Sequence, residues 1–269
     1  MSNFNEKTEN RTIVRIDRDG RREEDDLIIK EHALTITLSD GKFVKDRRYV
    51  TMFCSPSDLE MLGLGFLLSE DLISSIDDVE SLSISDDGSE LKVLLASNSN
   101  LAENLLAKRD ITSGCGRNLN PYDFLNNLKI NELSSSLRIS ADSIIQRSNE
   151  FQSMSTLYKS TGGTHAAALC DTYGILIFKE DIGRHNAVDK VFGECLIKGI
   201  KIDDKMILTS GRISSEILLK VTKRSIPIIV SRSAPTSLAL NFAEQAGVTL
   251  VGFARGGRMN VYSHEYRIE

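Results

Sequence analysis

The chain has 269 residues, of which 41% are hydrophobic and 26% charged, and its formal net charge is −5. This composition is that of a globular protein with room for one large domain or two, and the negative charge argues against broad binding to nucleic acid. No run approaches the ~20 apolar residues of a membrane-spanning helix, and the polar N-terminus lacks the apolar core of a secretion signal. We therefore expect a cytoplasmic protein that binds neither nucleic acid nor membranes.

The first part of the chain predicts a small α+β domain over residues 21–110, preceded by a polar, flexible N-terminus over 1–20. Two pairs of strand-like runs each flank an Asp-Gly dipeptide, which is typical of a hairpin. The runs cover residues 27–38, 43–53, 79–84 and 90–96. Between the pairs, Ser57 stands three residues before Glu60, as in a capping box, and an apolar helix is expected to reach about Leu72. The resulting order is ββαββ.

Residues 97–135 are rich in Asn, Ser and Gly, and we interpret 111–139 as a loop or linker that carries Cys115. Glycine on both sides leaves this sulfur sterically open, and Arg117 could stabilise a thiolate, the reactive form of cysteine. The alternative is a surface thiol without a role. The remaining cysteines lie on apolar segments, where buried and inert thiols are expected. They are Cys54, Cys170 and Cys195.

From residue 140 the pattern changes to a helix followed by alternating strands and helices, which predicts an α/β sheet with helices on both faces over 140–269. Four loops in this region follow an apolar run, are small and polar, and carry arginine. They cover residues 181–184, 209–212, 231–235 and 254–258. Loops at the carboxyl ends of strands gather at one sheet edge, where helix N-termini and arginine both favour phosphate. These loops predict a socket for a large anion, although arginine-bearing loops can also be ordinary surface connections.

Two histidines lie close to these loops. His165 follows a Gly-rich turn and could donate a hydrogen bond, carry a proton or be structural. His185, beside Arg184 at a predicted helix start, has the same alternatives. Neither the four histidines nor the cysteines have the spacing of a metal site, so no structural metal is expected.

Six short motifs give the chain a resemblance to the FdhD family, the formate dehydrogenase accessory sulfurtransferases, over about residues 30–269. They are Ser-Gly-Cys-Gly at 113–116, Thr-Gly-Gly-Thr-His at 161–165, the long run at 180–190, Thr-Ser-Gly-Arg at 209–212, the run at 231–236 and Gly-Phe-Ala-Arg at 252–255. The resemblance implies a cytidine-deaminase-like, three-layer α/β/α C-terminal domain without zinc. The zinc-deaminase ligand motif is indeed absent from the sequence.

The resemblance also implies a function. Cys115 would receive sulfur as a persulfide from a cysteine desulfurase and pass it to the bis-molybdopterin guanine dinucleotide cofactor, which then enters formate dehydrogenase. GDP would mimic the nucleotide end of this cofactor, and a homodimer is expected. The stretch 253–258 matches the family's guanine dinucleotide contact. With the loop argument, the candidate cofactor-binding residues are His165, Arg184, Gly211, Arg212, Arg232, Phe253, Ala254, Arg255, Gly256, Gly257 and Arg258.

One departure from the family pattern leaves the chemistry open. Many members carry a CxxC loop, but Asn118 stands here in place of the second cysteine. Either one cysteine suffices or sulfur transfer is impaired. The alternatives are a chaperone that carries the molybdenum cofactor without passing sulfur, and a nucleotide hydrolase or deaminase. The last has neither metal ligands nor a paired acid and base to support it.

Overall fold

A six-stranded sheet organises the C-terminal part of the chain in the computed structural model, which describes residues 4–96 and 132–269. The strand order is β12-β11-β10-β9-β7-β8. The strands are β7 (His165–Cys170), β8 (Ile175–Asp181), β9 (Met206–Thr209), β10 (Ile228–Ser231), β11 (Thr249–Arg255) and β12 (Arg258–Ser263). The three central strands β9, β10 and β11 are parallel, and β7, β8 and β12 are joined to the sheet in antiparallel fashion.

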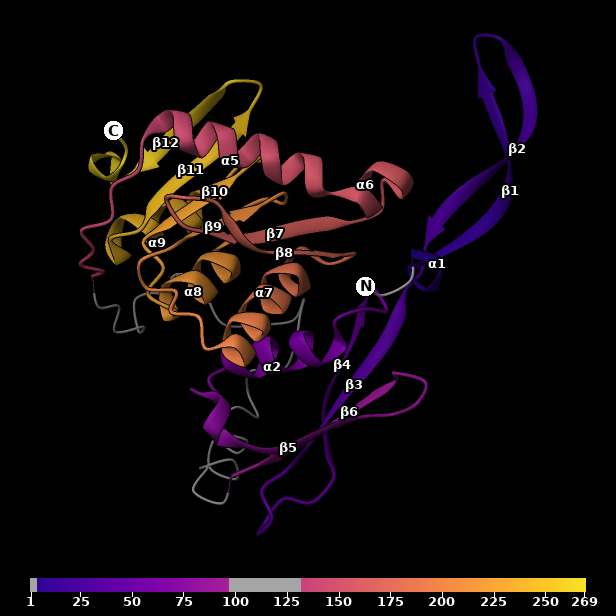
Figure 1. Cartoon of the computed structure of the whole chain (residues 1–269), viewed down its shortest axis with the longest axis horizontal. Helices are drawn as coiled ribbons and strands as arrows, with labels where there is room; N and C mark the ends of the chain where they lie inside the picture. Colours follow the sequence, from indigo (N-terminus) through magenta and orange to yellow (C-terminus); the bar gives the residue numbers. More distant parts are fainter. Residues whose placement is uncertain (1–3, 97–131) are drawn as a thin grey trace.

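Helices cover both faces of this sheet, as the sequence predicted (Figure 1). On one face lie α7 (Arg184–Lys198), α8 (Ser215–Lys223) and α9 (Ser237–Ala246), and on the other lie α5 (Ala141–Met154) and the short α6 (Thr156–Thr161). All residues of β9 and β10 are buried, as a sheet covered on both faces requires. Alternate strand residues enter two separate cores, so Ile207 and Ile229 pack toward α7–α9 and Met206 and Ile228 toward α5. The result is a three-layer α/β/α arrangement.

The N-terminal part forms a four-stranded sheet of order β4-β3-β6-β5 with one helix on it, which confirms the predicted ββαββ order. Its elements are β3 (His32–Ser39), β4 (Arg47–Cys54), α2 (Leu59–Ser69), the 3-10 turn η1 (Ile76–Asp78), β5 (Val79–Ile84) and β6 (Glu90–Leu95). The predicted capping box at Ser57 is wrong. Asp58 occupies the N-cap position with a positive φ of 54°, and its carboxylate pairs with Lys179 of β8 at 2.7 Å instead.

The two parts share one hydrophobic core, and their closest approach is the crossing of α2 and α7. Glycines make this crossing possible. A Cβ atom on Gly65 would lie 1.8 Å from the carbonyl oxygen of Asp189, and one on Gly193 would lie 1.8 Å from that of Met61. Since no real Cβ atom approaches a carbonyl oxygen so closely, side chains larger than hydrogen at these positions would push the helices apart.

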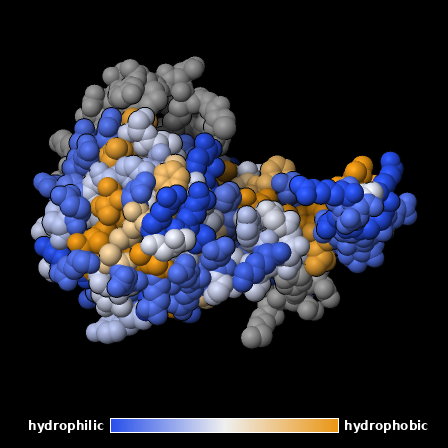
Figure 2. Space-filling model, turned by 90° about the horizontal axis from the view of Figure 1, so that it is seen from above, coloured by the Kyte–Doolittle hydropathy of each residue, from blue (hydrophilic) through white to orange (hydrophobic). Residues whose placement is uncertain are grey.

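The N-terminus departs from expectation. Residues 1–20 were predicted to be flexible, but β1 (Thr8–Asp17) pairs with β2 (Gly20–Ile29) in a long antiparallel hairpin that follows α1 (Phe4–Lys7). The hairpin projects from the body of the protein (Figures 1 and 2). Its turn signal is the Asp19-Gly20 dipeptide, and Gly20 has a φ of +118°. Residues on both faces of the hairpin are largely exposed, so its sequence lacks the alternation of apolar and polar residues that indicates strands.

The C-terminal domain also begins earlier than predicted. Leu133 donates its N–H to the carbonyl of Ala246 at 2.9 Å, and Ile139 forms a β-bridge with Ile268, next to the 3-10 turn η2 (Glu265–Arg267). Residues 132–139 therefore belong to this domain rather than to a linker. No helix in the described parts of the chain is both long and apolar enough to span a bilayer.

Candidate functional site

The four arginine-bearing loops converge at one edge of the six-stranded sheet. Strands β8, β9, β10 and β11 run in the same direction, because β8 and β9 are both antiparallel to β7, which lies between them. Their carboxyl ends therefore lie at a common edge, where β7 begins with His165. This confirms the predicted convergence and places the loops where α/β sheets bind ligands.

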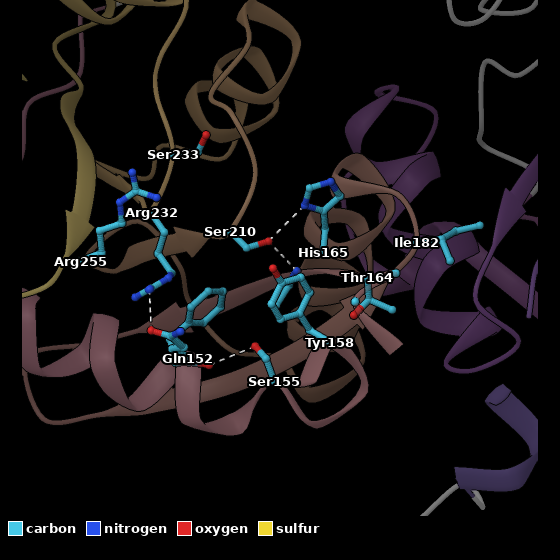
Figure 3. Close-up of a pocket in the computed structure, with 14 residues that line it drawn as sticks. Gln152, Ser155, Tyr158, Thr164, His165, Ile182, Ser210, Arg232, Ser233 and Arg255 are labelled. Atoms are coloured by element: carbon cyan, nitrogen blue, oxygen red, sulfur yellow. Dashed lines mark hydrogen bonds between the residues drawn. The ribbon is translucent and has the colours of Figure 1, made fainter. Parts of the chain in front are cut away.

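A cavity of about 550 Å³ opens at this edge, between the loops and the helices α5 and α6 (Figure 3). The lining residues are Phe151, Gln152, Ser155, Tyr158, Gly162, Gly163, Thr164, His165, Ala166, Ile182, Ser210, Arg232, Ser233 and Arg255. Its volume is in the range of small-molecule sites. Among the described residues the lining contains two arginines and no carboxylate, so its electrostatic preference is for an anion.

Arg232 is held entirely by neutral acceptors. Its guanidinium donates to the Oε1 atom of Gln152 at 2.5 Å and to the carbonyl oxygen of Ser148 at 3.3 Å. The Ser148 hydroxyl donates in turn to the carbonyl of Ala254. Burial lowers the pKa of Arg232, and the nearby charge of Arg255 lowers it further. The two guanidinium groups thus repel each other, and an anion bound between them would offset this repulsion.

Arg255 forms the other cationic edge of the cavity. It lies at the end of β11, and its guanidinium stands 5.8 Å from the ring centre of Phe253. Among the residues that the structure describes, no carboxylate pairs with Arg255 or Arg232. Figure 3 shows both arginines on one side of the cavity, with Tyr158 and His165 on the opposite side.

His165 lies at the start of β7, in the wall of the cavity. Its Nδ1 atom lies 3.2 Å from the hydroxyl of Ser210, which accepts the backbone N–H of Ala166 at 2.9 Å. Burial lowers the pKa of His165, and the charge of Arg184 lowers it further. When the Ser210 hydroxyl donates to Nδ1, the ring carries its proton on Nε2 and can donate it to a ligand.

One wall of the cavity, which was not predicted from the sequence, is held in place by the buried carboxylate of Glu180. Glu180 accepts the backbone N–H groups of Leu157 at 3.2 Å and Tyr158 at 3.0 Å, and also the hydroxyl of Thr164 at 3.2 Å. It therefore anchors the first turn of α6 and the Gly-rich turn that follows. The residues supplied by α5 and α6 were missed because a helical pattern does not tell which sheet edge its end will face.

Of the predicted cofactor-binding residues, Arg232, Arg255 and His165 line the cavity. Gly211 lies just behind it. A Cβ atom there would be 2.9 Å from Cβ of Arg184 and 3.4 Å from Nδ1 of His165, so this glycine lets the two side chains approach.

The other candidates surround the cavity without lining it. Ala254 is buried under Ser148, and Phe253 has a positive φ of 53°. Gly256 and Gly257 form the β11–β12 turn with φ values of +62° and +75°. The remaining candidates also do not line the cavity; they are Arg184, Arg212 and Arg258.

The long motif at 180–190 has a different main role. Asp181 and Lys190 form a fully buried ion pair at 2.6 Å, and Asp181 also accepts the backbone N–H of Ser55 at 3.0 Å. Asn186 donates to the carbonyl of Phe53 at 2.8 Å. These contacts tie the end of β4 to α7, and we call them the interdomain junction. One residue of the motif, Ile182, lines the cavity.

The three cysteines that the structure describes are buried, as the sequence predicted. Cys54, Cys170 and Cys195 are buried, and burial raises the pKa of each thiol to about 12, so they remain unreactive thiols. The predicted sulfur-carrying residue, Cys115, lies outside the described residues. Within the described ranges, no group of three or more His, Cys, Asp or Glu side chains is arranged to hold a metal ion.

Comparisons with known proteins agree on one family. The model of the FdhD/NarQ family matches residues 29–269. The "Sulfur carrier protein FdhD" of Bacillus pumilus is 40% identical over 244 residues, which is 90% of each chain, and that of Bacillus subtilis is 39% identical over 245 residues, 91% of each. The crystal structure of a protein assigned as a formate dehydrogenase accessory protein from Desulfotalea psychrophila superposes with a TM-score of 0.77 at 28% identity, covering 97% of this chain and 99% of that one. The family model begins after most of the N-terminal hairpin.

Proposed function

Because this chain belongs to the FdhD/NarQ family, we propose that it is a sulfur carrier that serves formate dehydrogenase. Cys115 receives sulfur from a cysteine desulfurase as a persulfide and passes it to bis-molybdopterin guanine dinucleotide, the cofactor of that enzyme. The observation that carries the proposal is the cavity at the sheet edge, where Arg232 and Arg255 have no carboxylate partner in residues 4–96 and 132–269.

The cavity suits the nucleotide end of that substrate. A diphosphate carries the charge that two neighbouring guanidinium groups require, and arginine binds phosphate oxygens with paired hydrogen bonds. The neutral His165 adds a donor, and the backbone around Gly162 and Gly163 allows close approach. Holding the substrate by its nucleotide end would lower the entropic barrier to sulfur transfer at its molybdenum end.

Cys115 would act by thiol–disulfide exchange chemistry. Its thiolate attacks the outer sulfur of a persulfide on the desulfurase. A bond forms between Cys115 Sγ and that sulfur, the donor's S–S bond breaks, and the electron pair leaves with the donor's own cysteine as a thiolate. The neighbouring Arg117 in the sequence favours the thiolate form of Cys115.

Three finer predictions belong to this proposal: a cytoplasmic location, a homodimer, and kinship of the C-terminal domain with cytidine deaminases. The three-layer arrangement supports the last of these.

Mass spectrometry tests the sulfur-carrying step. After incubation with a desulfurase and cysteine, we expect a gain of about 32 Da, one sulfur atom, on the peptide that contains Cys115. The buried Cys54, Cys170 and Cys195 serve as internal controls and should gain nothing. Absence of the adduct on Cys115 would contradict the proposal. The same gain of mass by a Cys115→Ala protein would also contradict it.

A second candidate is a cofactor-binding chaperone that passes no sulfur, and Asn118 at the position of the second cysteine favours it. Maturation of formate dehydrogenase in cells that carry Cys115→Ala distinguishes the two. The sulfur carrier predicts no active enzyme, whereas the chaperone predicts full activity.

A further inference from the structure

The cavity has an aromatic wall opposite its two arginines. Two aromatic side chains belong to the lining, Phe151 and Tyr158. Phe151 is 1% exposed and packs edge-on against Phe178 at 5.5 Å, so it belongs to the core beneath the cavity. Tyr158 is 52% exposed and therefore presents a free ring surface to whatever occupies the space.

Two backbone hydrogen bonds hold Tyr158 in place. The Glu180 carboxylate accepts its N–H at 3.0 Å, and its carbonyl accepts the N–H of Gly162 at 2.7 Å. Gly162 has a φ of +66° and ends α6 immediately after this turn. Both backbone groups of Tyr158 are thus satisfied by protein, and about half of the residue stays exposed at the cavity.

The positively charged side chains and the exposed aromatic ring therefore lie on opposite sides of one cavity. Arg232 and Arg255 occupy one side and Tyr158 the other (Figure 3). A simple anion such as pyrophosphate would use the arginines alone. A nucleotide would place its diphosphate on the arginines and its flat base within reach of the tyrosine ring.

We propose that Tyr158 is the residue with which this protein distinguishes a nucleotide from a bare diphosphate, by stacking on the base. The inference rests on the proposed function, since it assigns a base-recognition residue to the same cavity. Stacking on an aromatic ring stabilises bound bases and tolerates different bases, because every base has a π-face. The phenol hydroxyl is not needed for this interaction, so phenylalanine should replace tyrosine.

Calorimetric titration with two ligands tests the assignment. For Tyr158→Ala we expect GDP to bind about tenfold more weakly, while pyrophosphate binds as it does to the unaltered protein. Tyr158→Phe should bind GDP within about twofold of the unaltered protein. Tyr173→Ala is the matched control, because Tyr173 is 89% exposed on the β7–β8 turn and does not line the cavity.

The pyrophosphate titration reports whether the cavity is intact in each variant. Equal GDP affinity of Tyr158→Ala and the unaltered protein would overturn the inference and leave the proposed function standing. Equal losses of GDP and pyrophosphate affinity would also overturn it, since Tyr158 would then be structural. Failure of the unaltered protein to bind GDP would overturn the proposed function itself, and the inference with it.

Discussion

The interdomain junction and the rim of the cavity use basic side chains in opposite ways. At the junction and around α7, the buried Lys190 and the half-buried Lys179 and Lys220 each have a carboxylate. Lys190 pairs with Asp181, Lys179 with Asp58 and Glu194, and Lys220 with Asp189. At the rim, the hydrogen-bond acceptors of Arg232 are neutral, and within the described part of the chain neither Arg232 nor Arg255 pairs with a carboxylate. A cation whose charge is already matched holds the fold together, whereas a half-buried cation left unmatched is available to a ligand.

The two regions nevertheless meet in one short segment. Asp181 faces the junction and the next residue, Ile182, lines the cavity, while the N–H of Ile182 donates to the Ser55 hydroxyl at 3.1 Å. The packing of the N-terminal domain therefore sets the position of one wall of the cavity.

The largest effect is expected at the junction, from Lys190→Met. This change leaves the Asp181 carboxylate buried without its cation, and losing one partner of a fully buried pair costs about 3–5 kcal/mol. The free energy of unfolding, measured in urea, should fall by that amount. An Asp181→Asn, Lys190→Met double variant should lose less, because no charge is left unpaired. If Lys190→Met is as stable as the unaltered protein, the pair does not hold the domains together.

A smaller loss of stability is expected from Gly65→Ala. The added methyl group would overlap the carbonyl of Asp189, so α2 and α7 must separate, at a cost of about 1–3 kcal/mol. Gly174→Ala is the matched control, because nothing lies within 4 Å of its added Cβ. Equal unfolding midpoints for the two variants would rule out close packing at the α2–α7 crossing.

At the rim, Arg255→Ala should weaken binding without destabilising the fold. We expect GDP affinity to fall about tenfold, which corresponds to the loss of one charge-assisted hydrogen bond. Arg212→Ala is the control, since Arg212 follows β9 at the same edge of the sheet but does not line the cavity. Titration calorimetry compares the two. An equal loss from Arg212→Ala would show that overall positive charge, and not this cavity, attracts the ligand.

At neutral pH the smallest effect is expected from His185, because its contribution to stability changes only at lower pH. Burial, followed by the charge of Lys220, lowers the pKa of His185 to about 4 in the folded protein, against about 6.5 in the unfolded chain. Between these values the unfolded chain binds more protons, so the free energy of unfolding should fall as the pH drops from 6.5 toward 4. His185→Gln should flatten this part of the profile relative to the unaltered protein. Parallel profiles for the two proteins would show that His185 titrates normally.

The sequence was sufficient for those features that depend on local pattern. Asp-Gly turns located the hairpins of the small domain, and the alternation of strands and helices implied that the arginine loops share one sheet edge. It could not sort the arginines and lysines by role, because their partners are distant in sequence. Lys179 and its partner Asp58, for example, are 121 positions apart. For the same reason the wall formed by Gln152 and Tyr158 was not predicted.

The central claim is that basic residues at the rim of the cavity bind the ligand, while those at the interdomain junction hold the fold together. A crystal structure of the protein with GDP tests this claim most directly. We expect the diphosphate oxygens to lie within hydrogen-bond reach of the Arg232 and Arg255 guanidinium groups, while Lys190 still pairs with Asp181. A nucleotide bound elsewhere, with both arginines free of contact to it, would contradict the account.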